Sequence, residues 1–148
     1  MTTWTTEDND FIHQLTIGFL RIGRKYKRFM NRSLAENGAV GVAYSYIVAI
    51  ARNPGVHQDH LADIQGVDKS GVARVLRDLE VDGYIARELF PDDRRRNMIS
   101  LTEKGQELHG LIRRITREWE TLIKGSIQEQ DIITTIQTID QIVENIDK

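Results

Sequence analysis

The sequence contains no cysteine and only two prolines in 148 residues. The missing cysteines exclude disulfide frameworks, thiolate metal sites, cysteine nucleophiles and thiol-based redox sensing. Because proline interrupts helices, its scarcity, together with only four phenylalanines, indicates a helix-rich chain. The length suits one domain, or one small domain with helices devoted to assembly, and we expect no second independent domain.

Long apolar runs are missing as well. The longest nearly apolar stretch, residues 39–51, is too short to span a bilayer and contains two tyrosines and a serine. The amino end, "MTTWTTEDND", is polar and acidic and does not resemble a secretory signal. We therefore predict a cytoplasmic protein with no membrane partner.

The charges are unevenly distributed along the chain, although the formal net charge is only −2. Residues 21–32 carry six basic side chains and no acid, whereas residues 126–148 carry five acids and a single lysine. The position of charges, more than their sum, decides which partners a surface attracts. The small negative net charge therefore does not exclude a nucleic-acid partner.

Apolar residues recur at helical spacing along several segments, which predicts helices over residues 9–34, 40–51, 102–124 and 132–146. Asn53, Pro54 and Gly55 end the second helix, and Thr102 is placed to cap the third. The isoleucine stripe of the last helix can fold back on its own core or pack on a second copy. Because this stripe is too large for a small monomer to cover, we predict a homodimer.

The middle of the chain has the spacing of a helix-turn-helix. Ala62, Gly66, Val72 and Val75 lie at offsets of four, ten and thirteen from the first. A small residue at 62 lets two helices approach closely, Gly66 can adopt the left-handed turn conformation, and the two valines face inward. The alternative is an ordinary helical hairpin.

With the valines and leucines of the second helix inward, polar and small residues occupy its start and outer face. Arginine and serine at these positions suit contact with DNA bases and phosphates in the major groove. The predicted DNA-binding residues of this helix are Lys69, Ser70, Gly71, Arg74 and Arg77. The alternative for Lys69 and Arg77 is simple solvation.

Two strand-like runs, "YIARELF" and "RNMISL", flank "PDDRR", so a β-hairpin follows the second helix. Three consecutive arginines, Arg94, Arg95 and Arg96, lie at its tip, where guanidinium groups can enter a narrow minor groove. Asp93 is predicted to accept hydrogen bonds within the turn and to hold one arginine in place. A solvated charge run is the alternative interpretation.

These features together resemble the MarR family of bacterial transcriptional regulators. The resemblance rests on "HLADIQGVDKSGVARVLRDLEVDGYIAR" and on "DRR" at residues 93–95 followed by "LTEKG" at 101–105. It implies a homodimer on a palindromic operator in double-stranded DNA, with Arg95 in the minor groove, Asp93 as its partner, and Ser70 and Arg74 on the recognition helix. His57 departs from the family pattern, which often has Thr or Ser capping the helix there.

The family resemblance also implies release of DNA by a small, often aromatic and anionic effector that enters a crevice between the dimer helices and the DNA-binding lobe. Tyr26, Tyr46 and Trp119 are the candidate lining residues, with plain core packing as the alternative. No cofactor is predicted.

Two other classes of protein compete with a DNA-binding regulator. An enzyme is disfavoured because no phosphate-binding loop, nucleophile elbow or paired catalytic carboxylates stand out; His57 and His60 have a tolerable metal spacing, but no cysteine completes a structural zinc set. A winged helix that docks only protein partners remains the second alternative.

We predict a mainly α fold with a small β-hairpin wing, in which a winged helix-turn-helix is joined to long terminal dimerisation helices. Residues 1–148 form a single domain, with a DNA-binding lobe at 35–101 and a dimerisation region at 9–34 and 102–148. The predicted function is sequence-specific transcriptional regulation, as a repressor.

Overall fold

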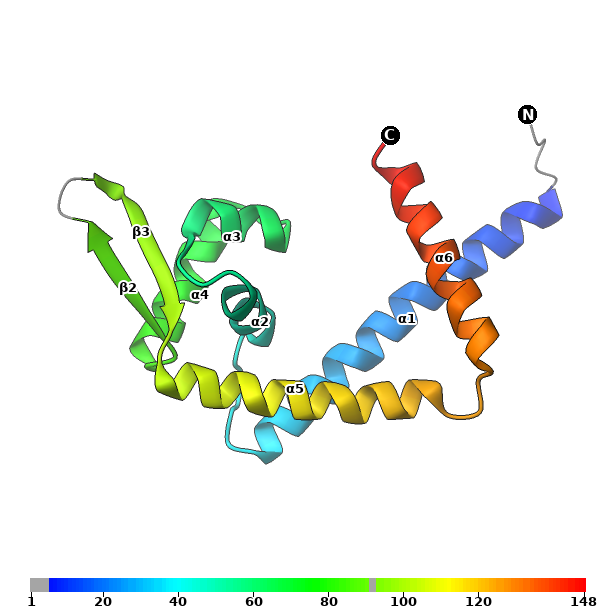
Figure 1. The fold of residues 1–148 in the computed structure, drawn as a ribbon. Coiled ribbons are helices and arrows are strands. Elements are labelled where there is room, and N and C mark those ends of the chain that lie inside the picture. Colours follow the sequence, from blue (N-terminus) through cyan, green and yellow to red (C-terminus); the bar gives the residue numbers. More distant parts are fainter. Residues whose placement is uncertain (1–5, 91–92) are drawn as a thin grey trace. The chain divides into compact units, whose positions relative to one another are not determined.

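The computed structural model describes residues 6–90 and 93–148, and the side chains of residues 10–88 and 98–148. The chain divides into two compact units, Met1–Thr116 and Arg117–Lys148. Its elements follow the order shown in Figure 1: α1 (Thr6–Glu36), α2 (Tyr44–Arg52), β1 (Val56–His57), α3 (Gln58–Gln65), α4 (Lys69–Val81), β2 (Ile85–Phe90), β3 (Asp93–Leu101), α5 (Glu103–Lys124) and α6 (Glu129–Ile146).

The first unit contains a small antiparallel sheet with strand order β1-β3-β2. β2 and β3 form the predicted hairpin, with Ile85 opposite Leu101 and Arg87 opposite Ile99. β1, which pairs Val56 with Ile99, was not predicted, because two residues are too few for an alternating pattern. The helix-rich winged fold is therefore confirmed, with a third strand added to its sheet.

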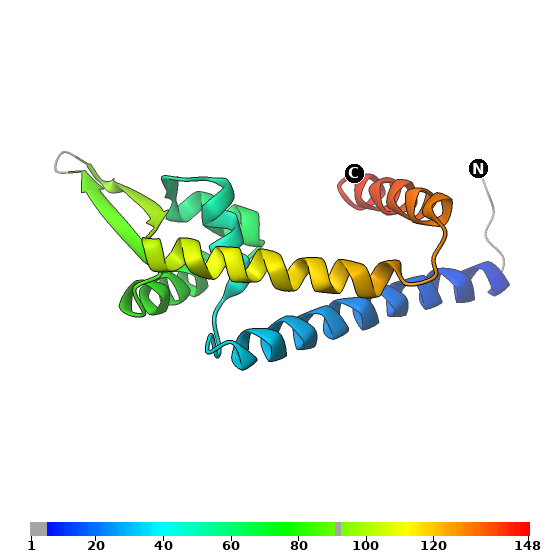
Figure 2. The ribbon, with the colours of Figure 1, turned by 60° about the horizontal axis from the view of Figure 1, so that its bottom comes forward.

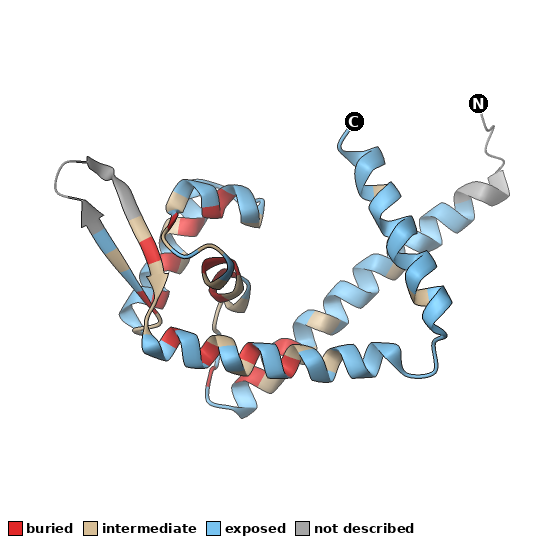
Figure 3. Ribbon diagram, in the orientation of Figure 1, coloured by how far each residue is buried: buried red, intermediate tan, exposed pale blue. Residues whose placement is uncertain are grey.

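The core of the first unit fills the space between the helices and one face of the sheet (Figure 3). Each large side chain buried there stabilises the fold by about 1.5–3 kcal/mol relative to exposure. The most fully buried ones come from the carboxyl end of α1, from α2, α3, α4 and β3, and from the part of α5 that belongs to the first unit: Met30, Leu34, Ile47, Ile50, Leu61, Val72, Leu76, Ile99, Ile112 and Ile115.

The boundary of α2 differs from the prediction. The helix begins at Tyr44, four residues after the predicted start at Val40. Gly38 and Gly41 have φ angles of +80° and +70°, a left-handed conformation that cannot continue a right-handed helix, and Val40 is 77% exposed. The apolar residues 39–43 therefore belong to a turn that joins α1 to α2.

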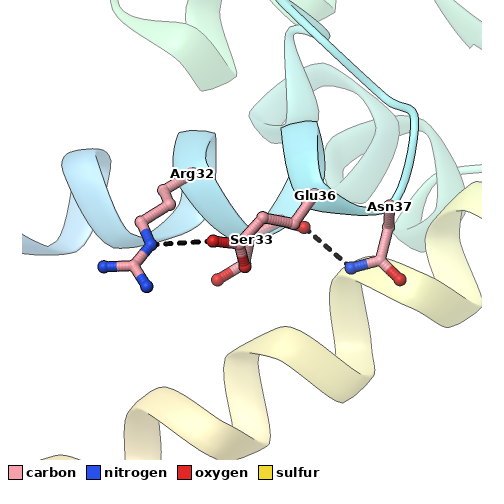
Figure 4. Close-up of polar contacts among 4 residues, drawn as sticks. All are labelled: Arg32, Ser33, Glu36 and Asn37. Atoms are coloured by element: carbon pink, nitrogen blue, oxygen red, sulfur yellow. Dashed lines mark hydrogen bonds and ion pairs between the residues drawn. The ribbon is translucent and has the colours of Figure 1, made fainter.

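The end of α1 is held by polar contacts (Figure 4). The Arg32 guanidinium pairs with Glu36, with Nε 2.9 Å from Oε1, and the Asn37 side chain donates to the Ser33 carbonyl at 2.8 Å. Asn37 also accepts a 3.3 Å hydrogen bond from Arg114 of α5. These contacts fix the point where the chain leaves α1 for the winged part of the first unit.

The second unit contains the last part of α5 and all of α6. α6 has the predicted apolar stripe, but none of its side chains is buried. Ile133, Ile136, Ile139, Val143 and Ile146 are between 38% and 76% exposed. In the part of the chain that the structure describes, no helix has the length and apolar character needed to cross a membrane.

Candidate nucleic-acid interface

The turn between α3 and α4 has the geometry that the helix-turn-helix spacing predicts. Gly66 ends α3 in the left-handed conformation, with φ 62° and ψ 34°. A side chain at this position would strain the backbone, so glycine lets the chain turn sharply. Ala62, only 4% exposed, keeps the approach between the two helices close. Both sequence-based interpretations are confirmed.

Asp68 caps the start of α4. Its Oδ1 atom accepts a 2.9 Å hydrogen bond from the Gly71 backbone N–H and another from the Ser70 hydroxyl. The Ser70 hydroxyl and then the Gly71 N–H hold the pKa of the Asp68 carboxyl below its usual value, because both favour the ionised form. The ionised cap also complements the positive end of the helix dipole and fixes where α4 begins.

The two faces of α4 separate as the spacing predicts. Val72, Leu76 and Leu79 are buried against the core. The opposite face and the helix start carry the predicted DNA-binding residues, all of which are exposed: Lys69, Ser70, Gly71, Arg74 and Arg77. α4 therefore presents three cationic side chains to solvent from a helix whose inner face is anchored.

Lys69 has a partner that the sequence did not reveal. Its Nζ lies 3.0 Å from Oδ2 of Asp59 in the first turn of α3, and both side chains are about 70% exposed. An exposed ion pair of this kind is worth at most about 1 kcal/mol. The pair thus leaves Lys69 free to exchange its carboxylate for another anion at little cost.

The hairpin of β2 and β3 projects beyond the helices of the first unit in both views (Figures 1 and 2). This is the position of a wing beside α4. β3 begins at Asp93, so Asp93, Arg94, Arg95 and Arg96 belong to the distal half of the hairpin. Their side chains lie outside the described residues.

An ion pair joins the base of this wing to α4. Arg87 of β2 places its Nε 3.0 Å from Oε2 of Glu80, and the Arg87 side chain is only 19% exposed. Nε is buried and makes no aligned hydrogen bond, so Glu80 compensates it as an ion pair. Neither residue has a role that the sequence predicts, because nothing in their spacing indicates that they meet.

The segment "LTEKG" ties α5 to the turn after α4. The Thr102 hydroxyl accepts from the Gly105 N–H at 3.1 Å, which makes Thr102 the predicted cap, and donates to the Gly83 carbonyl at 2.6 Å. A Cβ atom on Gly105 would lie 2.0 Å from the Tyr84 carbonyl oxygen. Only glycine therefore fits where α5 crosses the chain between α4 and β2.

Lys104 adds a second attachment at the same place. Its Nζ donates to the Asp82 carbonyl at 2.6 Å and lies 4.5 Å from the centre of the Tyr84 ring. A cation over an aromatic face contributes about 0.5–1 kcal/mol at an exposed site. These contacts thus connect the start of α5 to the end of α4 and to the start of β2.

A cavity of about 500 Å³ lies beside α2 in the first unit. Tyr26 of α1 and Tyr44 of α2 form part of its wall and meet edge to face, with ring centres 6.2 Å apart. The full lining is Tyr26, Tyr44, Ser45, Val48, Ala49, Arg52, Asn53, His60, Ile64 and Gln65. It therefore combines aromatic walls with one arginine and one histidine.

The predicted effector residues are placed differently from one another. Tyr26 lines the cavity, Tyr46 is 7% exposed within the core, and Trp119 belongs to the second unit. Burial raises the pKa of both Tyr44 and Tyr46, so both phenols stay neutral near pH 7. The sequence could not distinguish Tyr44 from Tyr46, because nothing in it shows which of the two faces the cavity.

The two histidines near α3 lie in different surroundings. His57 is the residue before α3 and its side chain makes no capping hydrogen bond, as expected for the departure from Thr or Ser. His60 lines the cavity. Among the described side chains, no group of three or more potential ligands could hold a metal ion.

Comparison with known proteins agrees with this geometry. A family model described as the MarR family matches residues 41–96, which run from the turn before α2 to the distal wing. The uncharacterized HTH-type transcriptional regulator YybA of Bacillus subtilis (strain 168) is 38% identical over 73 residues, which cover 48% of this chain and 47% of that protein. The chain thus spans about half the length of the first curated relatives it matches.

Solved structures extend the likeness beyond the winged part of the chain. A putative MarR family transcriptional regulator from Listeria monocytogenes, complexed with 26mer DNA, is 25% identical with a TM-score of 0.78 and covers 88% of this chain and 87% of that chain. The crystal structure of MarR is 32% identical with a TM-score of 0.73, and the match covers 88% of this chain and 96% of that one. The chain therefore belongs to the MarR family of HTH-type transcriptional regulators, a family that is not one of enzymes.

Proposed function

We propose that this protein is a homodimeric repressor that binds a palindromic operator in double-stranded DNA. The observation that carries the proposal is the anchored recognition helix α4, whose exposed side carries Lys69, Arg74 and Arg77 beside a projecting wing. A helix in the major groove with a wing in the neighbouring minor groove brings both sets of cations to one duplex. The relative from Listeria monocytogenes, complexed with 26mer DNA, supports this use of the fold.

The wing arginines complete the proposed interface. Asp93 holds one arginine in place at the tip, and Arg94, Arg95 and Arg96 supply the charge that a narrow minor groove attracts. Ser70 and Gly71 allow the start of α4 to approach the phosphates closely. On binding, the Ser70 hydroxyl exchanges Asp68 for a phosphate or base acceptor.

A gel-shift series on operators selected from a random DNA pool, repeated at several salt concentrations, tests DNA binding. Arg95→Ala should weaken operator binding by about 1–3 kcal/mol, and Lys69→Gln should lower the salt slope by up to about one unit. Lys124→Gln at the end of α5 is the charge-matched control and should change neither the operator affinity nor the salt slope. A protein that docks only protein partners would shift no duplex even in dilute buffer, and that result would refute the proposal.

Dimer formation is proposed from the apolar surface of the terminal helices. α6 buries none of its stripe, and the amino-terminal half of α1 exposes Phe11, Leu15, Phe19, Leu20 and Ile22. A second copy covers such surfaces and gives the complex a twofold axis. Twofold symmetry then places two recognition helices about 34 Å apart, one turn of DNA.

The cavity beside α2 is the proposed effector site. Its volume of about 500 Å³ suits a small molecule, and Arg52 and His60 favour an anion beside the aromatic wall that Tyr26 and Tyr44 form. α2 and α3 both contribute to the wall. An occupant that binds more tightly to one arrangement of α2 and α3 therefore shifts the DNA-binding equilibrium. Benzoate should raise the melting temperature and weaken operator binding, and Arg52→Gln should reduce both effects; benzoate without effect on either would exclude an aromatic anion here.

A further inference from the structure

The wing and the recognition helix must be held at one angle if both are to reach the same duplex. We propose that Glu80 and Arg87 are positioning residues that set this angle without touching DNA. This role rests on the proposed DNA binding, and it concerns two residues that neither the winged-helix spacing nor the wing motif assigns to the interface.

The geometry places the pair between the two DNA-binding elements. Glu80 lies in the last turn of α4, beyond Arg74 and Arg77, and Arg87 is the third residue of β2. The charged atoms of the two side chains are 3.0 Å apart. The turn that joins α4 to β2 contains only residues 82–84. The pair therefore closes a short loop of chain from the recognition helix to the wing.

Burial makes this ion pair different from the others among the described side chains. Ile85 is buried, Ala86 exposed, Arg87 half-buried and Glu88 exposed, so Arg87 lies on the inward face of β2. The side chains are 19% exposed for Arg87 and 43% for Glu80, whereas both partners of the Lys69–Asp59 pair are about 70% exposed. Removing Glu80 leaves the Arg87 guanidinium, whose side chain is largely buried, without its counter-charge, which favours movement of that side chain toward solvent.

A tilt of β2 at Arg87 displaces the tip of the hairpin more than its base. Phe90 ends β2 three residues later, roughly 10 Å further along the strand at about 3.3 Å per residue. A tilt of about 15° at the base thus displaces Phe90 by roughly 2–3 Å. Such a displacement is enough to take a guanidinium group out of hydrogen-bonding range of a groove.

The arrangement can be measured without DNA, because the chain contains no cysteine. Spin labels attached through Asp78→Cys on α4 and Asp92→Cys between β2 and β3 report the distance from helix to wing by pulsed electron paramagnetic resonance, with unlabelled chain added in excess to suppress signals between protomers. In Glu80→Gln, the distance distribution should broaden and its mean should move by about 2–3 Å or more. The exchanged pair, Glu80→Arg with Arg87→Glu, should restore the original distribution, and Glu107→Gln on the exposed side of α5 should leave it unchanged.

Operator binding supplies a second readout that general destabilisation would not reproduce. Arg95→Ala should weaken binding about tenfold or more in the unaltered chain but less than about twofold in Glu80→Gln, because the wing is already misplaced. Arg74→Ala should keep its full effect in both backgrounds. Arg87→Gln, which removes the charge of the other partner, serves as a second variant if Glu80→Gln does not fold.

An unchanged distance distribution in folded Glu80→Gln, or in Arg87→Gln where that variant is used, would overturn the positioning role. So would an undiminished effect of Arg95→Ala in the same background. Failure of the proposed function has a different signature, since the unaltered chain would then bind no duplex, while the distance measurement would still report on the pair.

Discussion

Helices α4 and α6 carry apolar stripes of similar regularity, yet only one of them is buried. In α4, Val72 and Leu76 are fully buried and Leu79 is 3% exposed, whereas Ile136 and Ile146 of α6 are 53% and 76% exposed. Periodicity therefore predicts a helix in both places but does not say whether the partner of the stripe belongs to the same chain. Burial supplies that distinction: it assigns α4 to the core of the first unit and leaves the stripe of α6 exposed for the proposed dimer interface.

The largest effect is expected where the stripe of α6 is made charged. Ile136→Glu with Ile139→Glu places two carboxylates in the proposed interface, so the protein should become monomeric by light scattering and should lose operator binding. Gln137→Glu with Gln141→Glu adds the same charge on the other side of the helix and should leave the dimer intact. A dimer that persists in the first variant would contradict the assignment of α6.

In α4, a substitution in the apolar stripe should instead lower the stability of the fold. Leu76→Ala removes a fully buried side chain and should lower the free energy of unfolding by about 2–5 kcal/mol in urea titrations. Val81→Ala in the same helix removes a side chain that is 80% exposed and should change it by less than about 0.5 kcal/mol. Equal effects of the two substitutions would mean that α4 is not anchored as described.

Gly105 and Gly110 of α5 sharpen the comparison further. A side chain at Gly105 would collide with the backbone, whereas one at Gly110 would not. Gly105→Ala forces a Cβ to within 2.0 Å of the Tyr84 carbonyl oxygen and should destabilise the first unit by about 1–3 kcal/mol. Gly110 has no atom within 4 Å of its Cβ position, so Gly110→Ala should stabilise by about 0.4–1 kcal/mol. Thermal unfolding measures both changes in stability, and we predict that they have opposite signs.

The smallest effect concerns the cap of α4. The pKa of Asp68 is lowered in the folded chain, so its contribution to stability is present above its ordinary value of 3.8 and is lost as the pH falls through the lower folded value. Asp68→Asn keeps an acceptor for the Gly71 N–H but does not titrate. The unaltered chain should therefore lose more stability than Asp68→Asn in melting curves taken from pH 5 down to about pH 2.5; parallel curves would exclude this role.

The features that sequence predicted well are those set by neighbours along the chain. Gly66 takes the left-handed conformation, Thr102 caps α5, and the inner face of α4 is the predicted one. Each depends on backbone sterics or hydrogen bonds within a few residues. Such local effects are encoded by residue type and spacing, so they can be read without the fold.

The features that sequence missed depend on segments that meet only after folding. The pairs Lys69–Asp59 and Arg87–Glu80 join different elements, and β1 exists only because β3 lies beside it. The cavity likewise needs α1, α2 and α3 together, and its aromatic wall includes Tyr44, which the spacing gave no reason to prefer. Residue types along one segment do not determine such distances.

The carboxylate of Asp59 beside Lys69 has a consequence for how salt affects the protein–DNA equilibrium. When Lys69 moves to a phosphate in the proposed complex, the duplex releases a bound cation, but Asp59 loses its own counter-charge and attracts a cation from solution. The two exchanges partly cancel. The logarithmic dependence of affinity on salt concentration will therefore be shallower than the number of cationic side chains at the interface suggests.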